Sequence, residues 1–207
     1  GMGGSAVMTE IPEMFGAERL LLDRCVSKEK FDDLAKLIQD FKRYFTDHGE
    51  SVGENPSPGN KEGGITTLEE KSLGCVLKGG HAAVCDVLRY GARVRERGLT
   101  VLEAPGNDAT AQTALAAAGA QLVLFTTGRG TPLGGIVPTL KISTNTALAS
   151  AKPHWIDFDA GRAEKIGVTE TAEELMRLVI ETANGKTTAA ENNRSREIAV
   201  WKRGVTL

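Results

Sequence analysis

The sequence has little of what marks secreted, membrane-spanning or nucleic-acid-binding proteins. Its 207 residues include only three cysteines, a small and odd number that argues against the disulfide framework of a small secreted protein. No apolar run approaches the ~18 residues of a membrane-spanning helix. The 25 basic and 27 acidic residues nearly cancel, which argues against a nucleic-acid or polybasic membrane surface. We therefore predict a cytoplasmic globular protein with no nucleic-acid or membrane partner. The sequence leaves a homo-oligomer open.

The first part of the chain combines one predicted strand with helices. Residues 5–11 are typical of a buried strand that ends at Pro12. A short helix is expected over 17–24. The longest helix follows Ser27, an acceptable N-cap, and closes at Gly49. Its apolar residues recur at helical spacing: Phe31, Leu34, Leu37, Ile38, Phe41, Tyr44 and Phe45.

A second, shorter helix is predicted by a capping box. Thr66 or Thr67 stands three residues before a glutamate, and this spacing begins many helices. We expect the helix to end near Leu73, because Gly74 interrupts the pattern. Residues 86–94 then favour a helix or a loop.

The next segment alternates strand and helix. Residues 99–103 and 121–127 are strand-like, and an alanine-rich helix lies between them over 109–118. Asn107 or Asp108 is expected to cap that helix. This order is typical of a right-handed βαβ unit with two parallel strands.

The remaining pattern completes an α/β fold. Further strands are expected over 141–143 and 155–158, a last helix starts at Thr169 or Thr171, and 197–201 resembles an edge strand. We predict a Rossmann-like fold with a mostly parallel sheet flanked by helices. Residues 1–4 are interpreted as a tag remnant, and 5–207 as one α/β domain.

Two glycine-rich loops are the most informative features. The first spans 55–64 and carries Asn60 and Lys61, and the second spans 125–135 and carries Arg129. Each places small residues and main-chain amides beside one cation, as a site for a small anion requires. The second loop has the spacing of neither a Walker loop nor a dinucleotide fingerprint.

The second loop follows an apolar strand, where α/β proteins place ligands. The amides around Thr127, Gly128 and Gly130 are expected to form an anion-binding nest, and the guanidinium of Arg129 suits a carboxylate. A tight turn with a solvated arginine explains the same residues equally well.

Four other residues are candidates for chemistry. Asn107 either caps a helix, the commoner role, or binds substrate hydroxyls. Lys141 is a potential general base if burial lowers its pKa, and Asn145 follows it as a polar neighbour. Glu10, at the end of the first strand, is suited to moving a proton or holding a divalent ion, although acids also simply begin helices.

The sequence signal for a zinc site is weak. Cys75, His81 and Cys85 are spaced Cys-x5-His-x3-Cys, without the paired short spacing of structural zinc sites. We do not predict a metal centre there.

Several of these segments together resemble the C-terminal part of the altronate/galactarate dehydratase family. The shared sequence motifs are residues 9–13, 55–64, 72–74, 104–108, 125–130 and 141–145. Residues 152–158 and the ending 196–207 favour the altronate branch. The resemblance extends over about 5–207.

The resemblance implies a hydro-lyase that converts D-altronate to 2-keto-3-deoxy-D-gluconate and water in hexuronate catabolism. It also implies Fe²⁺ or another divalent metal, with ligands mainly in an N-terminal part that this chain does not include. Removing a proton beside a carboxylate requires stabilisation of the developing negative charge.

We hypothesise that Arg129 or Lys61 grips the carboxylate, and that Lys141 or Glu10 assists proton transfer. Two alternatives remain. One is a non-catalytic binding or assembly domain that supplies part of a site. The other is a dehydratase for galactarate or a related hydroxy acid.

Overall fold

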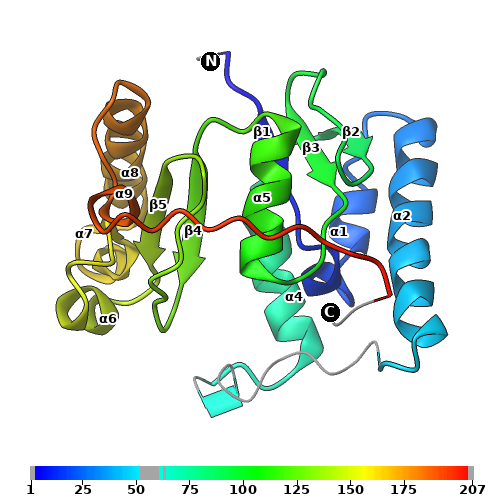
Figure 1. The fold of residues 1–207 in the computed structure, drawn as a ribbon, viewed down its shortest axis with the longest axis horizontal. Helices are drawn as coiled ribbons and strands as arrows, with labels where there is room; N and C mark the ends of the chain where they lie inside the picture. The colour runs from blue at the N-terminus through cyan, green and yellow to red at the C-terminus, as the bar shows by residue number, and fades with distance from the viewer. Residues whose placement is uncertain (1–2, 52–60, 63, 205–207) are drawn as a thin grey trace. The chain divides into compact units, whose positions relative to one another are not determined.

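The computed structural model describes residues 3–51, 61–62 and 64–204. The chain divides into two compact units (Figure 1). The first unit comprises 1–119 together with 200–207, and the second comprises 120–199. The second unit is therefore inserted into the first along the chain. The C-terminal segment, here the described residues 200–204, belongs again to the first unit.

The first unit is built on a parallel sheet of three strands. Strand β3 (Leu99–Leu102) lies between β1 (Ala6–Met8) and β2 (Val84–Leu88). Successive side chains of a strand point to opposite faces. Accordingly, Val101 belongs to one apolar cluster and Leu102 to another.

Helices cover both faces of this sheet. The 3₁₀ helix η1 (Ile11–Met14), α1 (Arg19–Leu22), α2 (Lys28–Asp47) and α4 (Leu68–Leu77) contribute to the larger cluster. Helix α5 (Asp108–Ala118) packs its alanines against the end of β3.

The predicted helix signals of this unit are confirmed. The Ser27 side chain accepts a hydrogen bond from the Lys30 amide at the start of α2, and Gly49 has a positive φ of 75° just beyond its end. Thr67 begins α4 with a complete capping box. Asn107, not Asp108, caps α5.

The second unit has its own parallel sheet, in the order β4 (Val123–Thr127), β5 (Thr139–Ser143), β6 (Phe158–Asp159). All five residues of β5 are buried. The other elements are α6 (Thr146–Ala151), η2 (Ala160–Arg162), α7 (Ala163–Ile166), α8 (Val168–Ala183) and α9 (Ala189–Asn192).

The α/β class and the parallel pairing are confirmed, and the Rossmann-like arrangement stays a prediction. The βαβ unit is wrong, because β3 and β4 lie in different sheets. Strand β4 pairs with β5, starting with Val123 beside Thr139. The order of elements along the chain does not specify which strands pair.

Several boundaries also differ from the prediction. The strand expected over 155–158 is the two-residue β6, and the helix expected to be the last is α8, which begins at Val168 and is followed by α9. Residues 86–94 begin inside strand β2, where the buried carboxylate of Asp86 accepts a hydrogen bond from Lys30 at 2.9 Å. Helix α4 continues through Gly74 to Leu77, because Val76 packs into the core.

The ends of the chain differ too. The strand expected over 5–11 stops at Met8, and Pro12 lies in the first turn of η1. No described residue of 197–201 is in a strand. Instead, the Trp201 amide donates to the Tyr90 hydroxyl. In the described part of the chain, no helix is long and apolar enough to cross a membrane.

Candidate functional site

The carboxyl edge of the first sheet gathers the ends of β1, β2 and β3, because these strands are parallel. Two contacts hold the chain beyond β1 against the exit of β3. The Thr9 hydroxyl donates to the Leu102 carbonyl at 2.9 Å, and the Ile11 amide donates to the Ala104 carbonyl at 3.1 Å. Glu10 lies between these two anchors. This is the edge where parallel α/β sheets bind ligands.

Glu10 is the most perturbed acid at this edge. Its φ of 65° is left-handed, a conformation that costs a non-glycine residue of order 1 kcal/mol. Burial raises the pKa of its carboxyl from 4.5 to about 7, although nearby Lys78 opposes that rise. A carboxyl with this pKa can take up and release a proton near neutral pH.

The neighbouring Glu13 is fixed in place. Its Oε2 lies 2.8 Å from the Lys71 ammonium, and both side chains are largely buried. The Cys75 thiol points to the same oxygen, at 3.8 Å. Gly106 leaves room for Glu13, because a Cβ at that position would stand 3.2 Å from its Oε1.

The thiol and a second acid beside Glu13 are also perturbed by burial. Burial raises the pKa of Cys75 to about 11, so this thiol stays protonated at neutral pH. Burial also raises the pKa of Asp108, and the charge of Glu13 adds to that rise.

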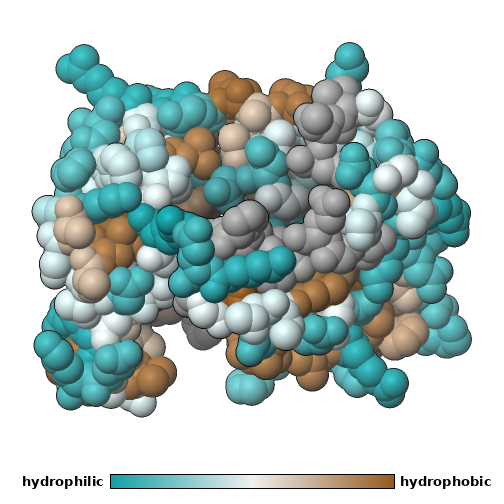
Figure 2. Space-filling view, turned by 90° about the horizontal axis from the view of Figure 1, so that it is seen from below, coloured by the Kyte–Doolittle hydropathy of each residue, from teal (hydrophilic) through white to brown (hydrophobic). Residues whose placement is uncertain are grey.

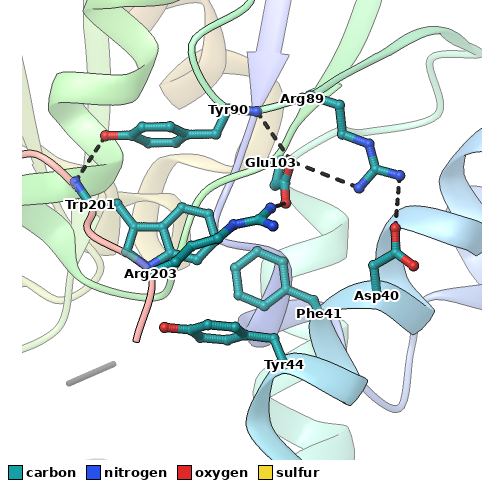
Figure 3. A pocket seen from close by; sticks show the side chains of 8 residues that line it. All are labelled: Asp40, Phe41, Tyr44, Arg89, Tyr90, Glu103, Trp201 and Arg203. Carbon is teal, nitrogen blue, oxygen red and sulfur yellow. Dashed lines mark hydrogen bonds and ion pairs between the residues drawn. The ribbon is translucent and has the colours of Figure 1, made fainter. Parts of the chain in front are cut away.

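A pocket of about 590 Å³ opens at the ends of β2 and β3 (Figure 3). Asp40, Phe41 and Tyr44 of α2 form one wall. The chain after β2 and β3 supplies Arg89, Tyr90 and Glu103, and the C-terminal segment supplies Trp201 and Arg203. All of these residues belong to the first unit.

Glu103 is the charged centre of the pocket. Its side chain is only 4% exposed, and it accepts hydrogen bonds from Arg203 at 2.8 Å and from the Tyr90 amide at 3.2 Å. Arg89 lies 3.8 Å from Glu103 and also donates to Asp40 at 2.9 Å. The pocket therefore holds two guanidiniums and two carboxylates.

Aromatic rings complete the pocket. Trp201 stacks on Phe41, with ring centroids 5.2 Å apart and planes inclined by 7°. Tyr44 and Tyr90 meet the same indole edge-on. On the face shown in Figure 2, hydrophobic residues form separate small patches among hydrophilic ones.

None of the pocket residues was predicted from the sequence as a site residue. One available signal was Glu103, a carboxylate directly after an apolar strand. The others come from segments far apart in the chain.

The glycine-rich loop after β4 folds back on itself. The Gly130 amide donates to the Thr127 hydroxyl at 2.9 Å, so this amide is already occupied within the loop. Asn145 donates from its side chain to the Gly128 carbonyl at 3.1 Å, and the Lys152 ammonium donates to the Arg129 carbonyl at the same distance. The predicted nest therefore lacks the Gly130 amide. Arg129 itself stays a candidate.

The remaining candidates are placed as follows. Lys141 is buried in β5 and donates to the Thr131 carbonyl, and burial lowers its pKa. Asn107 and Asn145 cap α5 and α6. Lys61 is exposed in the first unit. Asn60 and most of the first glycine-rich loop lie outside the described residues.

The described side chains do not fit a metal centre. Nowhere in the described ranges do three or more His, Cys, Asp or Glu residues gather so that they could hold an ion. We therefore derive no chemical step through a metal from this chain.

The fold and this edge define an α/β domain with ionisable side chains where such sheets bind ligands. The family model described as D-galactarate/Altronate dehydratase, C-terminal, matches residues 1–206, and the chain belongs to this family. The resemblance inferred from the sequence is thus confirmed.

Individual relatives agree with the family. The chain is 56% identical to altronate dehydratase of Escherichia coli (strain K12) over 206 residues, which are 99% of this chain and 42% of that protein. Altronate dehydratase of Bacillus subtilis (strain 168) is equally similar, with the same coverage of both chains. Galactarate dehydratase (L-threo-forming) of Escherichia coli is 34% identical over 187 residues, covering 89% and 36% of the two chains. The chain spans less than half the length of these relatives.

Proposed function

We propose that this chain forms the C-terminal part of a hydro-lyase that dehydrates D-altronate to 2-keto-3-deoxy-D-gluconate and water. The observation that carries the proposal is its 56% identity, over 99% of the chain, to two altronate dehydratases. Identity to the galactarate enzyme is lower, at 34%. This difference favours altronate over galactarate as the substrate.

The chemistry requires a base at C2 of the acid. The base takes the C2 proton, the released electron pair forms the C2=C3 bond, and the C3 hydroxyl leaves as water after gaining a proton. The enol then gains a proton at C3 and loses the proton of its C2 hydroxyl, which gives the 2-keto product.

We favour Glu10 as the base, because two hydrogen bonds, from Thr9 and Ile11, hold it at the carboxyl edge of the first sheet. Its pKa of about 7 matches this task. The ammonium of Lys141 is instead buried against the Thr131 carbonyl, so we place Lys141 second. Lys61 is a third candidate that rests on its sequence position alone.

Binding of the acid is assigned to cations and polar loops. Arg129 is proposed to grip the carboxylate, with Thr127 and Gly128 beside it, and Lys61 is the alternative cation. Asn60, Asn107 and Asn145 are proposed to contact hydroxyls. The side-chain oxygen of each capping asparagine accepts from a helix amide, so Asn107 would contact a hydroxyl through its side-chain nitrogen. The side-chain nitrogen of Asn145 already donates one hydrogen bond to the Gly128 carbonyl, so only its second N–H would serve.

We include Fe²⁺ or another divalent metal in the proposal, with its ligands mainly in the part of the enzyme outside this chain. When bound, such an ion would stabilise the negative charge that develops on the substrate carboxylate.

The competing function is a binding or assembly domain that supplies only part of a site. It is favoured by one observation, namely that the chain corresponds to 42% of each altronate dehydratase. The other alternative is a dehydratase for galactarate or a related hydroxy acid. Assays with a panel of acids that includes galactarate distinguish it from an altronate dehydratase.

The reaction itself provides the test. We expect this chain alone, given Fe²⁺ and D-altronate, to form no 2-keto-3-deoxy-D-gluconate, because the proposed metal ligands lie elsewhere. Mixing it with the remaining part of the enzyme should restore product formation, measured by chromatography of the 2-keto acid. Turnover by the chain alone would contradict the partial-site interpretation. Product from galactarate but not from D-altronate would contradict the proposed substrate.

A further inference from the structure

The geometry points to a recognition site for a small hydroxylated carboxylic acid in the pocket between α2, the ends of β2 and β3, and the C-terminal segment. This inference rests on the proposed function, because it assigns part of the substrate's binding to the first unit. None of the pocket's side chains was among the sequence-based candidates.

The place and size of the pocket suit a ligand of this kind. It lies at the carboxyl edge of the same parallel sheet as Glu10. Its volume of about 590 Å³ is within the range of small-molecule sites, about 300–1,000 Å³. The segments after β1 and β3 are joined by the hydrogen bond from the Ile11 amide to the Ala104 carbonyl. Glu10 and Glu103 each adjoin one of these two residues.

The two guanidiniums retain donors for a carboxylate. Each guanidinium has five N–H groups, and Arg203 donates to Glu103 through Nη2. The side chains of Arg203 and Arg89 are 67% and 46% exposed. Their solvent-facing N–H groups can therefore bind an incoming carboxylate in a fork geometry. Because D-altronate has one carboxylate, these arginines would take the role proposed above for Arg129 or Lys61.

The carboxylates favour a hydroxylated ligand. Glu103 and Asp40 each carry two oxygens with several acceptor sites. These oxygens neutralise the arginines and can also accept bonds from ligand hydroxyl groups. A plain anion would gain nothing from them, and an apolar ligand would leave both charged pairs unsolvated.

The tryptophan adds a rigid wall and an unused donor. Trp201 is held by its stack on Phe41 and by the hydrogen bond from its backbone amide to the Tyr90 hydroxyl. Its indole N–H is buried and has no hydrogen-bond partner among the described residues. Buried donors are nearly always paired, so this N–H is suited to a ligand oxygen or a bound water.

Tryptophan fluorescence can test the proposal directly on this chain. The sequence has two tryptophans, so Trp155→Phe leaves Trp201 as the only indole. We expect D-altronate to change its fluorescence saturably, and acetate and sulfate to do so only at far higher concentration.

The decisive variant is Arg203→Gln combined with Glu103→Gln, which removes the guanidinium without leaving Glu103 charged and buried. It should weaken D-altronate binding about 10- to 100-fold. Circular dichroism verifies that it folds. The matched control is Arg177→Gln on α8, an exposed arginine paired with Glu173 at 3.7 Å, which should leave binding unchanged.

Several outcomes would overturn the pocket assignment. They are the absence of saturable binding, equal binding of acetate or sulfate, and unchanged affinity in the folded double variant. If the complete enzyme still turns over D-altronate in that case, only the pocket fails. Saturable binding of galactarate by the pocket, with neither binding nor turnover of D-altronate, would instead support the pocket and contradict the proposed substrate.

Discussion

Glu10→Gln in the complete enzyme is expected to lower kcat on D-altronate by about 10²- to 10⁴-fold, the usual contribution of a general base. Glutamine keeps the size of the side chain but cannot accept the C2 proton. The residue is held between the Thr9 and Ile11 anchors, so the backbone around it should not move. Steady-state assays at several pH values measure the effect.

The pH dependence gives a second readout. Because burial raises the pKa of Glu10 to about 7, the ionised fraction of a base at this position increases as pH rises through about 7. We expect kcat/KM of the wild-type enzyme to rise with pH through about 7. The residual activity of Glu10→Gln should not show this rise.

Stability should change in the opposite direction. Between the ordinary glutamate pKa of 4.5, which applies to the unfolded chain, and the folded pKa of about 7, the folded state keeps a proton that the unfolded state releases. The free energy of unfolding of this chain therefore decreases as pH rises through that window. Glu10→Gln should remove this decrease.

The control for these measurements is Glu29→Gln, an exposed acid in the first turn of α2. It should leave kcat, the pH profile and stability nearly unchanged. Normal turnover by a folded Glu10→Gln enzyme would exclude Glu10 as the base and return Lys141 and Lys61 to first place.

Trp201→Ala is expected to destabilise the first unit by about 2–4 kcal/mol, somewhat less than a fully buried tryptophan because this one is half-buried. The substitution removes the stack on Phe41 and the edge contacts with Tyr44 and Tyr90. It also leaves Arg203 without the ring beneath its guanidinium. Urea unfolding, followed by far-UV circular dichroism, measures the shift in midpoint.

Val200→Ala is the matched neighbour, since Val200 is 70% exposed and should cost little. An unchanged urea midpoint for Trp201→Ala would mean that the C-terminal segment does not contribute to the core of the first unit. It would also weaken the description of the pocket as a rigid site.

Local signals in the sequence were sufficient for much of the fold. The caps at Ser27, Thr67 and Asn107 and the glycine beyond α2 are short-range features, because each involves residues within one helical turn. Strand pairing is long-range and was not predictable in this way. Strand β2 was missed because Asp86 interrupts its apolar pattern, and its partner Lys30 lies 56 positions earlier.

In the candidate site, too, some short-range features were predictable from the sequence and long-range ones were not. Glu10 was predicted from its place after a strand, but its raised pKa depends on burial that the sequence does not reveal. The pocket joins Asp40, Glu103 and Arg203, which no spacing rule connects. The Gly130 amide was expected to be free, and a single hydroxyl three residues earlier occupies it.

A crystal structure of the complete Glu10→Gln enzyme with D-altronate bound tests most directly whether the carboxyl edge of the β1-β3-β2 sheet handles the substrate. We predict density for the acid at that edge, with C2 facing the amide at position 10 and ligand oxygens near the pocket arginines. Acid bound solely by residues of the second unit, with the edge of the first sheet filled only by solvent, would contradict the account.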